Sequence, residues 1–474
     1  MIMEVIMKSW RIVLFSLIAV LLVSTISVSA AEIEESGASQ PWRFTKIEGY
    51  QDWDVGTHVS MVRHPKTGKL YISYYDSVNT ALMMAHEVAP GTGNCRDENW
   101  MCETVQSDDS VGKYSSIDVV YIESSNPILN HTKIGISFYD ATKQRLRYAT
   151  CNSGGLYTCV WQVYNVDDSS NEQMYIGIDS SLKFDSENIP HIAYHSYAII
   201  PFYSSVKFAS YVGEGTGNCI EGGSFDCETI DSKSSTLGHG SHTSLDFNLY
   251  SGDPIVAFYD AVDDALEMAY PTWIPGNECS NADWTCSIVD SNGNVGKYVS
   301  LHAPKTGYDT YRFAYYDATN AKIKYAVYVG TDGNCTNPAF DCYAVDTVGA
   351  YTDNMNPISL AIDTSQDDDY PVIAYSQVAP EGWTHLKIAR PAVSYGNDWG
   401  NCGEPPPGEM FQYWQCSIVN LGGQHMHEGY YVALDVNSAG LAAIAYSEEY
   451  VDYSENSLWL ARQQFEMYLP LIQR

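Results

Sequence analysis

The sequence is poor in positive charge. It has 25 lysines and arginines against 58 aspartates and glutamates, which gives a formal net charge of −33. Nucleic acids and anionic membranes are bound by clustered Lys and Arg side chains that neutralise phosphates. We therefore expect no nucleic-acid partner. The acidic surface favours solubility, and it can attract cations or basic partners.

Long apolar runs are also scarce. The N-terminus has one, Ile12–Val23, which follows two basic residues and precedes the small residues of Val28–Ala30. This order is typical of a signal peptide cleaved after Ala30, and the run is shorter than the roughly 20 residues that span a bilayer. We expect residues 1–30 to be removed, which leaves no membrane span. A retained anchor helix is the alternative.

Helical periodicity and common catalytic signatures are missing as well. No segment has a convincing 3.6-residue apolar period, and the chain contains no G-x-S-x-G, H-E-x-x-H or P-loop motif. No local motif supports an enzyme, and the sequence favours a protein that binds without chemistry.

What the sequence does contain is a repeat. The segment Tyr311–Ala326 has the pattern of a strand, a polar turn and a second strand, and seven versions of its first half occur along the chain. These are Ile72–Asp76, Ile136–Asp140, Ile192–Ser196, Val256–Asp260, Phe313–Asp317, Ile373–Gln377 and Ile444–Glu448. Each unit shows up to four short alternating segments. The pattern predicts an all-β fold, a seven-bladed β-propeller with four antiparallel strands per blade.

The two ends of the chain complement each other. The seventh unit stops after its third strand, whereas Trp42–Glu48 resembles the fourth strand of other units, such as Trp284–Asp290. We expect this N-terminal strand to complete the last blade and close the ring, which removes an exposed sheet edge. Residues 41–466 then form the propeller. Residues 467–474 form an apolar C-terminal tail that packs on the last blade or serves as a sorting or anchoring signal.

The twelve cysteines fall into six close pairs, one in each of the first six units. The pairs are Cys95 and Cys102, Cys151 and Cys159, Cys219 and Cys227, Cys279 and Cys286, Cys335 and Cys342, and Cys402 and Cys416. An even count behind a signal peptide indicates an oxidising compartment. No pair has the two-residue gap or the two nearby His partners of a zinc site. We predict six short-range disulfides.

The Y-Y-D-A…L-K-Y-A unit, with its G-x-G-N-C…W-x-C hairpin, resembles repeats of secreted bacterial β-propeller proteins. More distantly, it is similar to sialidase and BNR-repeat propellers and to propeller lectins. The resemblance covers nearly all of the mature chain. It implies the propeller fold and a secreted or cell-surface protein, but it names no ligand.

The channel mouth of the propeller is the predicted ligand site. The residue two positions before the Ser or Ala of each inner strand is expected to ring this mouth. These residues are His58, Tyr114, Asp179, His242, Tyr298, Pro357 and Tyr431. Aromatic rings beside carboxylates and hydroxyls suit the flat apolar face and the hydroxyl groups of a sugar. We therefore predict an extracellular carbohydrate ligand.

Three units depart from the Tyr-Asp pattern after the second strand and have a longer loop there. The irregular residues include His195, Tyr197, Phe202, Tyr203, Trp383, Glu448, Tyr450 and Tyr453. Irregular loops on a rigid scaffold often carry function, so His195, Trp383 and Glu448 join the predicted ligand-binding set. In the regular units, the corner residues Asp76, Asp140, Asp260 and Asp317 are expected to hold their own turns.

Histidines gather on the same predicted face. They are His58, His195, His239, His242, His425 and His427. The H-x-x-H and H-x-H spacings can place two imidazoles on one metal ion, and Asp-rich corners suit Ca²⁺. Loop histidines are more often plain polar residues. No cofactor is therefore predicted, with Ca²⁺ or a His-bound divalent metal as alternatives.

Two other functions stay open. A glycan-acting hydrolase or lyase would use two carboxylates about 5–10 Å apart, and nothing in the sequence singles out such a pair. Similarity to sialidases would also imply three clustered arginines and an S-x-D-x-G-x-T-W box, which the chain lacks. The second alternative is an extracellular protein-interaction scaffold. We expect a monomer.

Overall fold

In the computed structural model, Trp42–Gln464 form one compact unit. The structure describes residues 41–49, 54–168, 173–200, 202–234, 238–272, 279–305, 310–352, 355–365, 369–395, 399–405, 411–423, 426–450 and 455–464. The predicted signal peptide and C-terminal tail lie outside these residues, as do His425 and Tyr453. Among the described residues, no helix has the length and apolar character needed to cross a bilayer.

Seven groups of four strands account for the fold. The first three are β2 (Val55–Arg63), β3 (Leu70–Asp76), β4 (Ala81–Glu87) and β5 (Trp100–Gln106); β6 (Val111–Ile122), β7 (His131–Asp140), β8 (Arg145–Ser153) and β9 (Gln162–Asp167); and β10 (Met174–Phe184), β11 (Pro190–Ala198), β12 (Tyr203–Tyr211) and β13 (Phe225–Lys233). The next two are β14 (Ser241–Phe247), β15 (Pro254–Asp260), β16 (Ala265–Pro271) and β17 (Trp284–Asp290); and β18 (Val295–His302), β19 (Arg312–Asp317), β20 (Lys322–Tyr328) and β21 (Phe340–Thr347).

The last two groups are β22 (Ile358–Asp363), β23 (Tyr370–Val378), β24 (Thr384–Pro391) and β25 (Trp414–Asn420), and then β26 (Met426–Val436), β27 (Ala442–Tyr450), β28 (Glu455–Gln463) and β1 (Trp42–Glu48). Two short 3₁₀ helices, η1 (Pro127–Leu129) and η2 (Ala392–Tyr395), lie between strands. The predicted all-β class and the seven blades are therefore confirmed.

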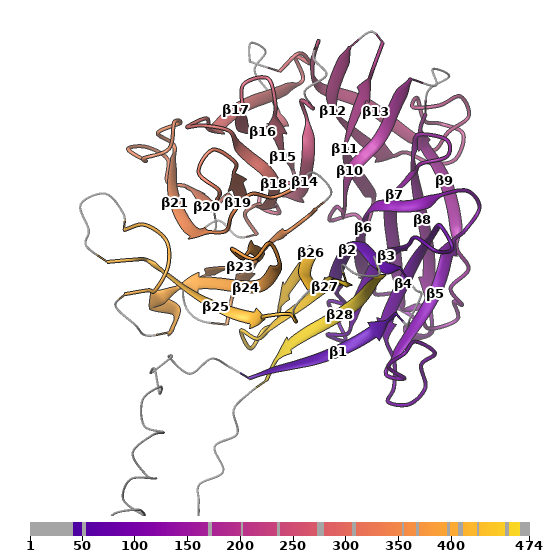
Figure 1. Cartoon of the computed structure of the whole chain (residues 1–474). Coiled ribbons are helices and arrows are strands. Elements are labelled where there is room, and N and C mark those ends of the chain that lie inside the picture. The colour runs from indigo at the N-terminus through magenta and orange to yellow at the C-terminus, as the bar shows by residue number, and fades with distance from the viewer. Residues whose placement is uncertain are drawn as a thin grey trace, which may run out of the picture. The chain divides into compact units, whose positions relative to one another are not determined.

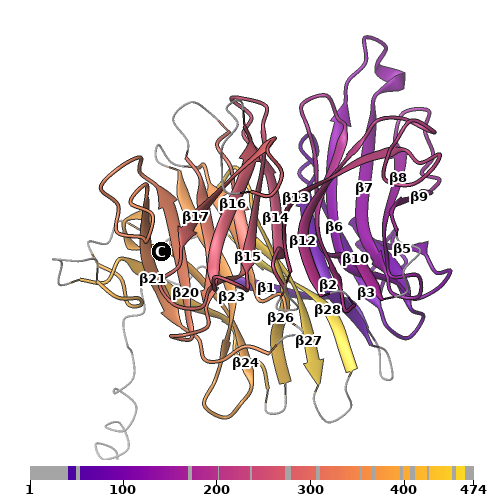
Figure 2. The same cartoon turned by 90° about the horizontal axis from the view of Figure 1, so that it is seen from above.

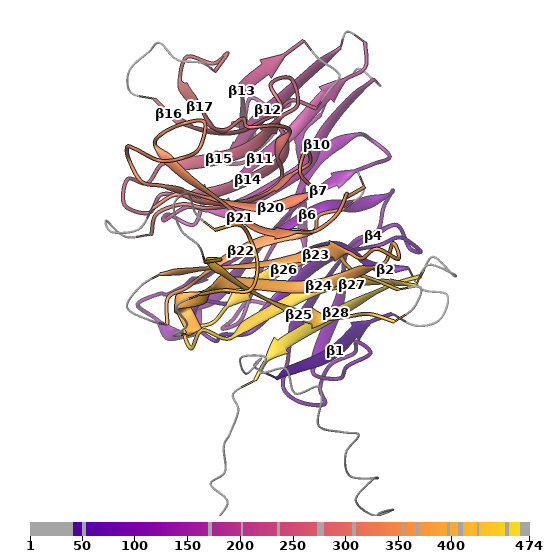
Figure 3. The same ribbon diagram turned by 60° about the vertical axis from the view of Figure 1, so that its left-hand side comes forward.

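The first five groups are separate four-stranded antiparallel sheets that pair in chain order. The last two join into one eight-stranded sheet through a single parallel pair, Thr384 with His427. Figure 3 shows β24 and β26 of these two groups close together. The N-terminal strand β1 pairs antiparallel with β28, from Trp42 opposite Gln463 to Thr45 opposite Leu460. In Figure 1 the indigo and yellow ends of the colour scale accordingly meet at β1 and β28. Strand β2 contacts both β26 and β28, and Figure 2 shows β2 beside β28.

The second strand of each blade is buried on both faces, because sheets pack against each side of it. Strand β19, for example, has no exposed residue. Its Tyr315 donates a hydrogen bond of 2.7 Å to Asp290 of the preceding blade, and Lys324 forms an ion pair with the same carboxylate. The corresponding sets are Tyr194, Lys207 and Asp167, and Tyr375, Lys387 and Asp346. A Tyr–Lys–Asp set thus connects three pairs of neighbouring blades.

The corner aspartates hold their turns, as predicted. Asp76 and Asp317 each accept a 3.0 Å hydrogen bond from the backbone N–H three residues later. Asp140 does the same with Lys143, and Asp260 accepts a 2.8 Å bond from Val262.

The predicted disulfides are confirmed, and no described cysteine is free. The six bonds join Cys95 to Cys102, Cys151 to Cys159, Cys219 to Cys227, Cys279 to Cys286, Cys335 to Cys342, and Cys402 to Cys416. In each of these six blades the second cysteine lies in or just before the fourth strand, so each bond fixes the loop that enters that strand.

One disulfide prediction concerns stability. Replacing Cys95 and Cys102 together by serine is expected to lower the free energy of unfolding by about 2.5 kcal/mol, because the unfolded chain regains the entropy of the closed loop. Urea denaturation of the oxidised protein would measure this loss. A similar double replacement at Cys402 and Cys416, which are 14 positions apart, should cost slightly more. Unchanged unfolding in both variants would contradict this account.

Candidate functional site

A bulge in the inner strand re-aims one side chain in each of five blades. The register shifts beside His58, Tyr114, Asp179, His242 and Tyr298, and these residues have φ between 49° and 55°. A left-handed backbone is uncommon for residues with a side chain and is often found at functional sites. Bulges re-aim side chains in this way. The sequence signal is a glycine two positions earlier, as in G-x-Y-x-S.

These glycines are required where they stand. Gly112, at φ 114°, has the backbone of Leu82 so close that an added Cβ would lie 2.7 Å from it. The glycine lets the chain turn into the bulge while it packs against the preceding blade.

Six of the seven predicted channel-mouth residues line one cavity of about 550 Å³. They are His58, Tyr114, Asp179, His242, Tyr298 and Tyr431. His195 lines the same cavity, and so does Lys113. Pro357 does not line it, contrary to the prediction. The sixth blade contributes Met355 and Asn356 instead, because its inner strand β22 starts only at Ile358 and has no bulge.

The rings around the cavity contact one another. The His58 ring lies 4.7 Å from that of Tyr114 and 4.6 Å from that of Tyr431, measured between centroids. The His242 and Tyr298 rings lie 4.4 Å apart. These contacts between adjacent blades give the cavity an aromatic wall.

Charge in the cavity is limited. Asp179 is the one carboxylate among the described lining residues, and it accepts a 2.8 Å hydrogen bond from the backbone N–H of His242. Burial, assisted by the nearby Lys113, lowers the pKa of His58 to about 3. Burial likewise lowers the pKa of His195 to about 4, although Asp179 opposes this shift. Both imidazoles are therefore neutral at pH 7.

Trp383 and Glu448, from the other two irregular units, are not among the described residues that line this cavity. Trp383 lies 5.6 Å from the ring of His427, which in turn stacks on Tyr430. Glu448 stands opposite Glu428 in the pairing of β26 with β27. Burial and repulsion by Glu448 raise the pKa of Glu428 to about 9, and burial raises the pKa of Glu448 as well. The predicted grouping of Trp383 and Glu448 with the channel mouth is therefore not seen.

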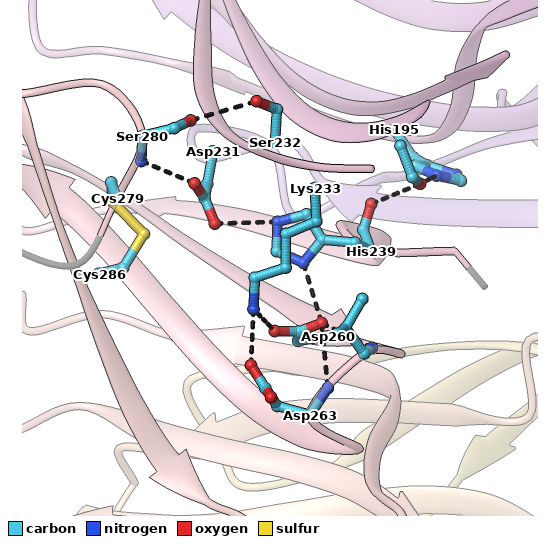
Figure 4. Close-up of polar contacts among 12 residues, drawn as sticks. His195, Asp231, Ser232, Lys233, His239, Asp260, Asp263, Cys279, Ser280 and Cys286 are labelled. Atoms are coloured by element: carbon cyan, nitrogen blue, oxygen red, sulfur yellow. Dashed lines mark hydrogen bonds and ion pairs between the residues drawn. A yellow bond between two sulfur atoms is a disulfide. The ribbon is translucent and has the colours of Figure 1, made fainter. Parts of the chain in front are cut away.

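His239 was expected with the other histidines but lies in a buried ion cluster between the third and fourth blades (Figure 4). Its Nε2 is 3.0 Å from Asp231 and its Nδ1 is 3.0 Å from Asp260. Lys233 also pairs with Asp260, and it lies 2.7 Å from Asp263. Burial opposes the charge on His239, but the two carboxylates outweigh burial and raise its pKa to about 9.

The repeat explains this cluster. Asp231 occupies the place of Asp290 in the Tyr–Lys–Asp sets, but the fourth blade has Phe258 and Glu267 where the fifth has Tyr315 and Lys324. Without a tyrosine hydroxyl or an ammonium group at those positions, Asp231 is neutralised by His239 instead. The register of the repeat could have revealed this exchange from the sequence.

In the part of the chain that the structure describes, three groupings with acidic side chains have ligand atoms close enough for a metal ion. They are Glu48 with Cys95 and Cys102, Asp231 with Glu267 and Cys286, and Asp260 with Asp263 and Glu267. The cysteines in the first two are disulfide-bonded and offer no thiolate, and Lys233 already pairs with Asp260 and Asp263 in the third. None of these three groupings favours Ca²⁺ or a His-bound metal, and both ions remain alternatives to the metal-free prediction.

No family model and no curated protein matches the chain. Similar solved structures include the fucose-specific lectin from Aleuria aurantia, with 10% identity over 80% of this chain and 98% of that chain and a TM-score of 0.41. An alpha-L-arabinofuranosidase from Fusarium graminearum has 10% identity over 74% and 98%, with a TM-score of 0.43. The endo-1,5-alpha-L-arabinanase from Thermotoga petrophila has 9% identity over 73% and 97%, with a TM-score of 0.29. At these levels neither ligand nor activity is transferred to this chain.

Proposed function

We propose that this protein is a secreted propeller that binds an extracellular carbohydrate in the channel-mouth cavity without chemical change. The observation that carries the proposal is the convergence of five ring side chains from different blades, beside one carboxylate, on one cavity of about 550 Å³. Sugar rings stack on such aromatic faces, and polar groups at the edges bind their hydroxyls.

The proposed setting is extracellular. Six disulfides fit an oxidising compartment, and removal of residues 1–30 would deliver the mature chain there. The pairing of β1 with β28 supports a ring closed by the N-terminal strand, because it gives the last blade a fourth strand from the other end of the chain. A closed ring would function as a monomer.

A glycan array followed by calorimetry tests the proposal. Tyr431→Ala and Tyr114→Asn should each weaken binding of the array hit about tenfold, which corresponds to roughly 1.4 kcal/mol for a lost stacking face. Asparagine is chosen at Tyr114 because it tolerates the left-handed backbone. Tyr250→Ala is the matched control, since Tyr250 is 79% exposed and lies outside the cavity lining. Equal affinities for all four proteins would reject this site.

The hydrolase alternative has a separate readout. Hydrolysis by the usual glycosidase route needs two carboxylates, and Asp179 alone lines the described part of the cavity. We expect a bound polysaccharide to be recovered at its original length. Released oligosaccharides that disappear in Asp179→Asn would establish a hydrolase. Binding of proteins but of no glycan would establish the interaction-scaffold alternative.

A further inference from the structure

A second cavity, of about 560 Å³, lies between β1 of the last blade and the strands of the first blade. It shares no lining residue with the channel-mouth cavity. Glu48 of β1, Tyr74 of β3 and Met83 of β4 form its buried side. The cavity opens to solvent, because three of its lining residues are exposed, namely Asn94, Thr104 and Ser107.

The repeat places a cation at the position of Met83 in three other blades. In each Tyr–Lys–Asp set the lysine forms an ion pair with the aspartate, and its Nζ lies 5.5, 5.6 or 5.7 Å from the centre of the tyrosine ring. The first blade has Tyr74, Met83 and Glu48 at these three positions. A methionine side chain reaches as far as the Cε of a lysine but lacks the ammonium group.

The other blades that depart from the set either lose the carboxylate or give it a new partner. The second and seventh blades have Gln106 and Asn420 in place of the aspartate, and in the fourth blade His239 pairs with Asp231. In the first blade the carboxylate remains as Glu48, and no described Lys or Arg forms an ion pair with it. Among the seven described blades, the first alone has the acid of the set without its base.

The missing ammonium group leaves Glu48 poorly compensated. Its side chain is buried, and burial raises its pKa, because the backbone N–H of Gly49 and the charge of Arg96 oppose this shift only in part. The corresponding Asp290 is also buried, but there Lys324 outweighs burial and the pKa lies below its ordinary value. The two sites therefore differ mainly in the presence of the lysine.

Tyr74 shows the effect of the same missing group. The side chain is fully buried beside the cavity, and its hydroxyl has no hydrogen-bond partner among the described residues, which calls for an explanation. In the complete set Tyr315 donates this hydrogen bond to Asp290. A cation that stabilised the charge of Glu48 would make its carboxylate the matching acceptor for Tyr74. The cation itself needs to contact only Glu48, so the hydroxyl needs no access to solvent.

We infer that this cavity binds a primary ammonium group, which occupies the place of the absent lysine Nζ beside Met83 and forms an ion pair with Glu48. Asp76 and Arg96 also line the cavity, with opposite charges. One negative charge is therefore left to neutralise, which matches a monovalent cation. A free alkylamine and an amino sugar present the same ammonium group. The inference goes beyond the proposed function and does not depend on the channel mouth.

A binding experiment compares the oxidised protein with two variants. In Met83→Lys the chain supplies its own ammonium group, and in Glu48→Gln the carboxylate is replaced by a neutral amide. The probes are butylammonium chloride and methyl glucosaminide, with tetramethylammonium chloride as a cation that has no N–H donor. We expect at least one primary ammonium probe to bind the unmodified protein and to bind each variant about tenfold more weakly. The probe that binds more tightly distinguishes free amines from amino sugars.

NMR of protein labelled with carbon-13 at the methionine methyl groups supplies a second readout, because the methyl group of Met83 adjoins the proposed site. Its signal is the one that Met83→Lys removes. We expect the bound probe to shift this signal and tetramethylammonium to leave it unmoved. A Met83 signal that no probe shifts, an equal shift with tetramethylammonium, or unchanged affinity in Glu48→Gln would overturn the inference. None of these results would bear on carbohydrate binding at the channel mouth.

Discussion

Replacing His239 by valine is expected to lower the free energy of unfolding by about 3–5 kcal/mol, the usual cost of breaking a buried ion pair from one side. His239 is fully buried between Asp231 and Asp260. Without it, Asp231 retains the 2.7 Å hydrogen bond from the backbone of Ser280 but loses its charged partner. Urea denaturation of the oxidised protein would measure the loss.

Two further variants make this prediction specific. Lys66→Ala removes an ion pair with Glu123 in which both side chains are more than half exposed, and it should leave unfolding unchanged within error. Phe258→Tyr with Glu267→Lys, added to His239→Val, restores the Tyr–Lys–Asp set of the neighbouring blades. This triple variant should recover most of the lost stability. If His239→Val alone were as stable as the unmodified protein, the cluster would not hold the two blades together.

Stability is expected to fall as the pH rises from about 6.5 to 9. The folded protein keeps the proton of His239 up to a pKa of about 9, whereas the unfolded chain releases it near the ordinary value of 6.5. The His239 ion pairs therefore contribute fully below pH 6.5, and the contribution is lost as the pH passes through 9. The expected loss is on the order of 3 kcal/mol.

Glu428 also makes the stability of the folded protein fall as the pH rises. Its carboxyl keeps a proton in the folded protein up to a pKa of about 9, because burial and Glu448 disfavour its charge. The unfolded chain releases that proton near the ordinary pKa of 4.5, so the folded state loses relative stability from there upward. Urea midpoints should decline as the pH rises towards 9. The decline should be less steep in His239→Val, and also in Glu428→Gln, than in the unmodified protein. A midpoint that rises towards pH 9 would contradict both assignments.

The repeat made the fold and much of the cavity predictable. Because blade positions recur, the cysteine pairs, the turn-holding aspartates and six of the seven channel-mouth residues follow from alignment of the units alone. The glycine before each bulge is also visible in the sequence. Pro357 does not line the cavity because the sixth inner strand starts only at Ile358. The spacing of the units does not determine where an individual strand starts.

The charged contacts between blades were not predicted, because they join residues far apart in sequence. Asp231 and Asp260 belong to different blades, so the spacing in the sequence groups their shared partner His239 with the other histidines instead. Trp383 and Glu448 stand out as exceptions to the repeat, but a departure from the repeat does not show where the side chain lies in the fold. Only the packed structure shows that His195 lines the cavity, whereas Glu448 lies opposite Glu428.

The central claim is that the channel-mouth cavity holds a saccharide. A crystal structure of the protein grown with the best glycan-array hit tests it most directly. The predicted result is electron density for a sugar ring against Tyr431 and Tyr114. Density for the glycan elsewhere on the protein, with the cavity containing only water, would contradict the claim.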